Sequence, residues 1–162
     1  NIALLLRAFA LLHDLPLTLK IAGEGSLKAE LIALAQQLGL SDRVEFLGMV
    51  QETIPLMAQS QHIVISSDFE GYPAVCVEAL AAGCYVIARD CSSGMQAMLS
   101  APNVGTLVST GTPEALADAI REVMQGARFN AEAARELAVK SLLGPVARSY
   151  LELFADVVEE KV

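Results

Sequence analysis

Short apolar segments alternate with segments of helical periodicity along most of this chain. Five of them have the length and apolar content of buried strands, and these are residues 17–23, 43–48, 62–67, 85–89 and 104–109. Helical spacing of apolar residues covers 2–13, 26–40, 52–60, 73–83, 94–100 and 112–126. Strands alternating with helices form parallel sheets that helices cover on both faces. We therefore predict an α/β fold with a doubly wound, Rossmann-like parallel sheet.

Residues with special backbone preferences set the expected ends of the helices. Ser26 is a plausible N-cap for the helix over 26–40, and Gly39 lies near its C-cap. Pro73 stands at the first position of the helix over 73–83, which Gly83 ends. Two further helices are expected within 130–162, separated near Gly144-Pro145. Together these elements make a single domain spanning residues 1–162.

The charge balance limits the classes of partner. The formal net charge is −8, so there is no basic footprint for nucleic acid or an anionic membrane. A phosphate would have to bind locally, through backbone amides and helix ends. No apolar run approaches the roughly 20 residues that cross a bilayer. Cys76, Cys84 and Cys91 lack metal or redox spacing, which indicates reduced thiols in a cytoplasmic protein.

A parallel sheet also predicts where a ligand binds. Ligands lie outside the carboxyl ends of the strands, so the loops that follow the strands are the candidates. The loop from Gly23 to Ser26 has two glycines that let the backbone approach a phosphate, although a plain tight turn explains them equally well. The third glycine of a dinucleotide fingerprint would fall at Lys28, which argues against NAD.

The stretch DFEGYPAVCVEALAAG, residues 68–83, has two carboxylates. Pro73 places Glu70 in the loop and Glu78 in the second turn of the following helix. Carboxylates accept hydrogen bonds from sugar and ribose hydroxyls, while free amides at a helix start suit a diphosphate. The alternative is that Glu70 and Glu78 are two solvated surface charges.

The remaining polar residues carry weaker signals. The loop from Asp90 to Gly94 either caps a helix or donates hydrogen bonds to a phosphate through its serines. His13 and His62 have no partner at metal-ligand spacing, and we expect both to be structural. Cys76 and Cys84 are expected to pack rather than react, because no histidine lies nearby in sequence to activate them.

Four segments in order carry a resemblance to a known family. They are IAGEG (21–25), VEFLG (44–48), SSDFEGYPAVCVEALAAGCYVIA (66–88) and VGTLVSTGTPEALADAI (104–120). The chain resembles the C-terminal, donor-binding domain of retaining glycosyltransferases of family 4, which have the two-domain GT-B fold. The specific part is the pair of glutamates separated by seven residues and followed by ALAAG.

The resemblance implies roles for individual residues. Glu70 would be the catalytic residue at the donor sugar, and Glu78 would bind the ribose hydroxyls. The other implied donor-binding residues, which would line the phosphates, the sugar and the base, are Gly23, Gly25, Gly48, Met49, Val50, Gly71, Tyr72, Pro73, Ala74 and Val75. No metal and no cofactor is implied.

The resemblance also implies a reaction. A sugar would pass from a nucleotide diphosphate-sugar to an acceptor with retention of anomeric configuration, and the acceptor would bind the protein's own N-terminal domain. That domain, the first strand and two cationic residues would precede Asn1, so we expect the isolated chain to be inactive. Ala97 also stands where the family often has a glutamate. The alternatives are a non-catalytic nucleotide-sugar-binding module and a GT-B-fold nucleotide-sugar epimerase.

Overall fold

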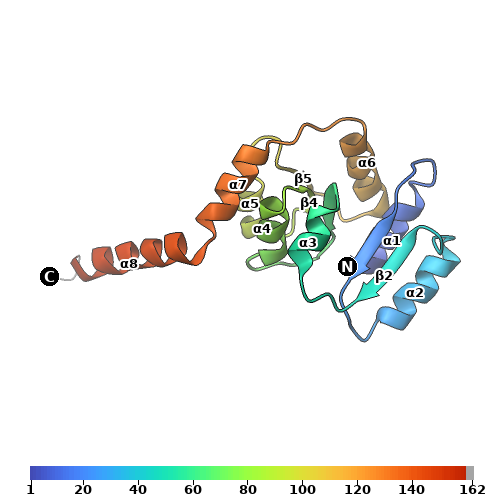
Figure 1. Cartoon of the computed structure of the whole chain (residues 1–162), viewed down its shortest axis with the longest axis horizontal. Coiled ribbons are helices and arrows are strands. Elements are labelled where there is room, and N and C mark those ends of the chain that lie inside the picture. Colours follow the sequence, from blue (N-terminus) through green and yellow to red (C-terminus); the bar gives the residue numbers. More distant parts are fainter. Residues whose placement is uncertain (160–162) are drawn as a thin grey trace.

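The computed structural model describes residues 1–159 and confirms the alternation of strands and helices (Figure 1). The strands are β1 (Leu19–Ala22), β2 (Val44–Gly48), β3 (His62–Ile65), β4 (Tyr85–Arg89) and β5 (Gly105–Val108). The helices between and after them are α1 (Ile2–Ala10), α2 (Lys28–Gln37), α3 (Thr53–Ala58), α4 (Ala74–Ala81), α5 (Ser93–Met98), α6 (Pro113–Met124), α7 (Ala131–Lys140) and α8 (Leu143–Glu159).

All strand pairs are parallel, as predicted for an α/β fold, but the strands form two sheets. β1 pairs with β2 in one sheet, and β4 lies between β3 and β5 in the other. The sheet was expected to be continuous. It is interrupted because β1 and β3, the facing edge strands, exchange no backbone hydrogen bonds in the described chain.

Helix ends agree with the sequence where a glycine ends a helix. Gly39 and Gly83 follow α2 and α4 with φ values of 72° and 82°, a conformation that glycine adopts without steric penalty. The predicted N-cap Ser26 is wrong. The Lys28 amide donates to the Gly25 carbonyl (3.1 Å), so a turn comes first and Leu27 becomes the N-cap, without a side-chain hydrogen bond.

Two prolines differ from their predicted places by one to three residues. Pro73 is the N-cap of α4 rather than its first helical residue. The expected break near Gly144-Pro145 is wrong as well, because both residues lie in the first turn of α8 and the chain turns at Ser141-Leu142. A proline is tolerated in the first helical turn, where its missing N–H has no intrahelical partner to lose.

Helices cover both faces of the β3–β5 sheet. Tyr85 and Ile87 of β4 belong to an apolar cluster with α1 and α6, whereas Val86 and Ala88 belong to a second cluster with α4, α5 and α7. This alternation follows from the two-residue period of a strand. The β1–β2 sheet is covered on one face only, where its apolar side chains join the first cluster; Lys20 and Glu45 are exposed.

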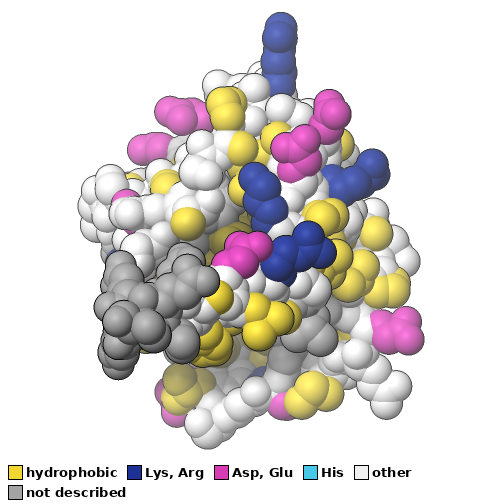
Figure 2. All heavy atoms as spheres, turned by 90° about the vertical axis from the view of Figure 1, so that its left-hand side faces the viewer, with side chains coloured by type: hydrophobic (Ala, Val, Ile, Leu, Met, Phe, Trp, Pro, Cys, Tyr) yellow, Lys and Arg dark blue, Asp and Glu magenta, His cyan; other side chains and the backbone are white. Residues whose placement is uncertain are grey.

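The last helix, α8, extends away from the rest of the molecule beyond α7 (Figure 1). Its exposed side chains include Tyr150, Leu151, Leu153 and Phe154. Figure 2 shows the end of the molecule from which α8 projects, where acidic, basic and apolar side chains are intermingled. Among residues 1–159, no helix combines the length and the apolar character that crossing a bilayer requires.

Candidate functional site

The loops that follow β1 and β2 lie against each other. The Gly23 amide donates to the Gly48 carbonyl (2.7 Å), and Glu24 forms an ion pair with Lys28 (2.6 Å). Gly48 has a φ of 72°, and a Cβ on it would lie 2.7 Å from Oε1 of Glu24. The positive φ favours glycine here, whereas the exposed end of the Glu24 side chain could move away from a Cβ. Gly23 and Gly25 are brought to the same edge as Gly48, where Met49 is 74% exposed.

The loop after β3 is tied to its neighbours at two points. Ser66 is buried, and its hydroxyl donates to the Asn1 carbonyl (3.0 Å). The Asp68 carboxylate accepts from the Asn1 side-chain amide (3.1 Å) and forms an ion pair with Arg89 at the end of β4. The Asn1 hydrogen bond, then Arg89, lower the pKa of Asp68. These contacts hold the base of the loop that carries Glu70.

Arg89 is a residue that sequence reasoning missed. Its side chain is 18% exposed, and its buried Nε has no hydrogen-bond partner among the described residues. No local signal identifies it, because its partner Asp68 lies 21 residues earlier. Arg89 ends one predicted strand and Asp68 directly follows another, so the parallel topology was the signal that could have placed them together.

The two glutamates of the motif occupy different environments. Glu70 is half-buried in the loop, and no residue of the described chain makes a hydrogen bond to its carboxylate. Glu78 is half-buried in α4, and its Oε2 accepts a hydrogen bond from the Thr53 hydroxyl (2.9 Å). Thr53 is the first residue of α3, which follows the Met49–Val50 loop. Glu78 therefore faces the segment that follows β2.

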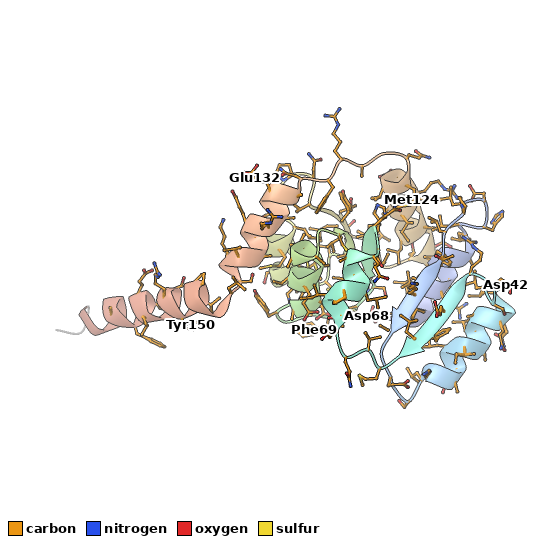
Figure 3. All side chains as sticks on the ribbon, in the orientation of Figure 1. Asp42, Asp68, Phe69, Met124, Glu132 and Tyr150 are labelled. Carbon is orange, nitrogen blue, oxygen red and sulfur yellow. The ribbon has the colours of Figure 1, made fainter. Side chains whose placement is uncertain are left out.

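The start of α4 offers fewer free amides than its sequence suggests. The Ala74 amide donates to the Tyr72 carbonyl and the Cys76 amide to the Pro73 carbonyl (both 2.9 Å). Within the described chain no such bond engages the Val75 amide. Pro73 is buried, whereas Gly71 and Tyr72 are exposed. Phe69, which Figure 3 labels beside Asp68 on the same loop, is 79% exposed.

The loop after β4 lies directly behind this segment. A Cβ on Gly94 would be 2.6 Å from the Gly71 carbonyl oxygen and 3.3 Å from Cδ of Pro73. Ser92 is the N-cap of α5, and its hydroxyl accepts a hydrogen bond from the Met95 amide (3.2 Å). The capped-turn interpretation of this loop is thus confirmed. Its additional role, supporting Gly71 and Pro73 by close approach, was missed because it depends on a tertiary contact.

Neither the buried cysteines nor the histidines are arranged as catalytic residues of the candidate site. Burial raises the pKa of Cys76 to about 12 and also raises that of Cys84, so both remain protonated and pack in the core. Burial also lowers the pKa of His62, which is half-buried in β3. His13 is exposed in the turn after α1. Packing was the predicted role for the two buried cysteines, and it is confirmed.

Comparison with known proteins assigns the chain to a family. The family described as glycosyl transferases group 1 matches residues 1–138. The chain belongs to this family. It is 34% identical over 125 residues to the Campylobacter jejuni N-acetylgalactosamine-N,N'-diacetylbacillosaminyl-diphospho-undecaprenol 4-alpha-N-acetylgalactosaminyltransferase, over 77% of this chain and 34% of that protein.

Solved structures agree with this assignment. A glycosyltransferase from Rickettsia africae superimposes with a TM-score of 0.83 at 23% identity, covering 97% of this chain and 44% of that one. Anabaena HepE, solved in complex with UDP and glucose, superimposes with a TM-score of 0.79 at 25% identity over 96% of this chain and 44% of that one. The expected GT-B-type α/β fold is confirmed. The chain spans about a third of the Campylobacter relative and under half of these two structures.

Proposed function

We propose that this chain is the C-terminal, donor-binding half of a retaining glycosyltransferase of family 4. The full-length protein would transfer a sugar from a nucleotide diphosphate-sugar to an acceptor held by its N-terminal domain. One observation supports this more than any other: the Thr53 hydroxyl directs Glu78 toward the segment after β2, while Glu70 stays without a partner among the described residues. The Glu78 carboxylate is thus oriented by a hydrogen bond, whereas the Glu70 carboxylate can accept hydrogen bonds from a ligand.

The proposed binding mode assigns each loop to one part of the donor. The base lies along Gly48, Met49 and Val50, and Glu78 accepts the ribose hydroxyls. The diphosphate lies between Gly23, Gly25 and the start of α4, where the Val75 amide has no acceptor within the described residues. The sugar then reaches Glu70, which acts on it as the catalytic residue.

The developing charge of the leaving diphosphate needs positive groups. Arg89 and Lys28 are cations at this edge, but the first is already paired with Asp68 and the second with Glu24. We propose that the cations that neutralise the diphosphate precede Asn1 in the full-length protein, as the family resemblance implies. No metal is required in this scheme. The isolated chain would then bind the donor weakly and transfer nothing, and the protein would work in the cytoplasm.

Titration of the chain with UDP, GDP and ADP, followed by calorimetry or by NMR, tests the proposal. We expect at least one of them to bind, and Glu78→Gln to weaken it about tenfold or more, because a hydrogen bond to a charged group is lost. Glu45→Gln is the matched control. It removes the same charge from an exposed residue on the uncovered face of β2.

A second substitution separates the two carboxylates. Glu70→Gln should leave binding of the free nucleoside diphosphate unchanged and abolish sugar transfer by the full-length protein, because Glu70 meets the sugar and not the nucleotide. Absence of binding with all three nucleotides would contradict the proposal. So would equal losses of nucleotide affinity for Glu78→Gln and Glu45→Gln.

A further inference from the structure

The guanidinium of Arg89 lies where three separate segments meet. Arg89 is the last residue of β4, and its side chain is 18% exposed. Its Nη1 donates to the Ser67 carbonyl (3.5 Å) and forms an ion pair with the Asp68 carboxylate, both in the loop after β3. Gly111, in the segment between β5 and α6, lies directly against the same guanidinium.

Gly111 leaves the room that this guanidinium occupies. A Cβ on Gly111 would lie 2.5 Å from Nη2 of Arg89, 2.9 Å from its Cζ and 3.2 Å from its Nε. The φ of Gly111 is not in the left-handed region, so the backbone itself does not require a glycine here. An alanine at this position would therefore push the guanidinium away from Asp68 without straining its own backbone.

Asp68 is held from a second direction by Asn1. Nδ2 of Asn1 donates to both carboxylate oxygens of Asp68 (3.3 and 3.1 Å). Oδ1 of the same side chain accepts from the Leu4 amide (3.0 Å) and caps α1. Asp68, although exposed, is thus fixed both to the start of α1 and to the end of β4 (Figure 3).

The place of Arg89 leaves one hydrogen bond unmade. Nε is buried, and no acceptor among the described residues reaches it. A buried donor without an acceptor is destabilising, and native proteins keep few of them. Stability alone is therefore a poor reason for an arginine here, and its contacts with the loop point to what it holds in place.

The same contacts argue against Arg89 as a ligand of the donor diphosphate. Nη1 is engaged by Asp68, Nη2 lies against Gly111, and Nε is buried. An anion would have to separate Arg89 from Asp68 before it could pair with the guanidinium. Arg89 is built into the support of the loop and is not presented to a ligand.

Glu70 stands two residues beyond Asp68 in the same loop, and no described residue makes a hydrogen bond to its carboxylate. The loop backbone therefore sets its position, and the side-chain anchor that precedes it is Asp68. We propose that Arg89, seated on Gly111, is a positioning residue that holds Asp68 so that Glu70 is presented to the donor sugar. The role of Glu70 rests on the proposed function, whereas the holding of the loop does not.

The two glutamates of the motif are supported independently. Thr53 orients Glu78 from α3, and none of the contacts of Arg89 involves Thr53 or Glu78. Loss of Arg89 should therefore disturb the sugar end of the donor site and leave the nucleotide end intact. A residue that merely stabilised the fold would show no such separation.

Order parameters of backbone amides in the full-length protein, measured by NMR relaxation without any ligand, test the holding of the loop. In Arg89→Ala the values for Glu70 and Gly71 should fall from the range of rigid backbone, about 0.85, toward about 0.6. The Gly25 amide, in the loop after β1, is the internal control and should not change. Arg7→Ala is the matched variant, because it removes the same charge from an exposed residue of α1.

Gly111→Ala gives an independent way to displace the guanidinium. It should loosen Glu70 and Gly71 as Arg89→Ala does, and it should add nothing when combined with Arg89→Ala, because the group that it displaces is then gone. Asp68→Ala, at an exposed site, supplies the same measurement should Arg89→Ala fail to fold. Additive effects of Gly111→Ala and Arg89→Ala on the loop would contradict the seat on Gly111.

Calorimetry of the full-length protein tests the consequence for the donor. The ligands are UDP, GDP and ADP and their glucose conjugates, and the reporter is a conjugate that Glu70→Gln binds more weakly. Arg89→Ala should lower the affinity for that conjugate about tenfold, the equivalent of one misplaced hydrogen bond to a charged group, and leave the affinity for the free nucleotide unchanged.

Unchanged order parameters at Glu70 and Gly71 in Arg89→Ala would overturn the proposal. Equal losses of affinity for the nucleotide and for its conjugate would overturn it as well, because Arg89 would then act on the whole site. A wild-type protein that binds no nucleotide, together with a loop that Arg89→Ala loosens, would contradict the proposed function while establishing that Arg89 holds the loop.

Discussion

The two sheets of this molecule arise from the same alternation of strands and helices, yet they differ in how completely they are covered. The β3–β5 sheet has helices on both faces, and β4 is buried along most of its length. The β1–β2 sheet has helices on one face, and residues along β1 alternate between half-buried and exposed. The alternation of strands and helices therefore makes both sheets parallel, whereas the number of faces that helices cover determines how deeply each strand is buried.

The difference extends to the loops at the carboxyl ends. The loop with Glu70 is held by contacts to other segments. Asp68 binds Asn1 and Arg89, and Gly94 packs closely against the Gly71 carbonyl. The loop with Gly23 and Gly25 is exposed, and a Cβ on either glycine would meet no atom within 4 Å. One side of the candidate site is thus rigidly supported and the other is open.

The largest expected effect comes from shortening a buried side chain in each of the two sheets. Ile87→Ala in β4 should lower the free energy of unfolding by about 2–5 kcal/mol, since Ile87 is fully buried and its loss leaves a cavity. Ile21→Ala in β1 removes the same atoms from a half-buried site and should have about half that effect. Urea denaturation of the two variants measures both values. Equal losses would mean that the two sheets are equally well packed.

A smaller effect contrasts the loops. Gly94→Ala should destabilise the protein by about 1–3 kcal/mol, because its Cβ would lie 2.6 Å from the Gly71 backbone oxygen, which cannot move without shifting the loop. Gly25→Ala is the matched control and should be near neutral, since its Cβ would meet nothing within 4 Å. Thermal unfolding checks the pair. If Gly25→Ala proved the more harmful, the assignment of a rigid and an open side would be reversed.

The smallest effect concerns an ion pair that joins the connection between α1 and β1 to helix α6. Asp14, in the connection to β1, pairs with Arg121 of α6, and the hydrogen bonds from Arg121 lower the pKa of Asp14 to about 2. A lowered folded-state pKa adds stability above the unfolded value of about 3.9, and this stability is lost as the pH falls toward about 2. Asp14→Asn should therefore reduce the loss of thermal stability between about pH 4 and 2.

Asp42→Asn is the control for that pH series. It removes another exposed carboxylate, one for which the described residues supply no ion pair. Melting temperatures measured from pH 2 to 7 should show a slightly flatter acid limb for Asp14→Asn alone. An identical acid limb in wild type and Asp14→Asn would show that the pair contributes nothing measurable, as many exposed ion pairs do.

Most of the fold could be predicted because its signals are local. The period of apolar residues placed all five strands, and Gly39 and Gly83 ended their helices as expected. Local signals failed where two local solutions compete. Ser26 lost its capping role to a turn that begins at Gly25, and the Gly144-Pro145 pair was absorbed into the first turn of α8.

The candidate site was predictable only in part. Glu70, Glu78 and the glycines come from a contiguous motif and from strand ends, both visible in the sequence. Their supporting contacts were not visible: Thr53 reaches Glu78 across 25 residues, and Asp68 reaches Arg89 across 21. Such pairs form when separate loops converge at one sheet edge, and nothing in either segment alone specifies the other.

By itself, the sequence determined the order and type of the elements, the parallel direction of the strands, and the positions of Glu70 in the loop after a strand and Glu78 in the helix that follows. These follow from side-chain periodicity and from the backbone limits of glycine and proline, which act within a few residues. Only the tertiary structure decided that the strands form two sheets, and that Thr53 orients Glu78 while no described residue makes a hydrogen bond to Glu70. Those outcomes depend on which backbone and side-chain groups find partners across the molecule, and hydrogen bonds between distant segments exist only once the chain has folded.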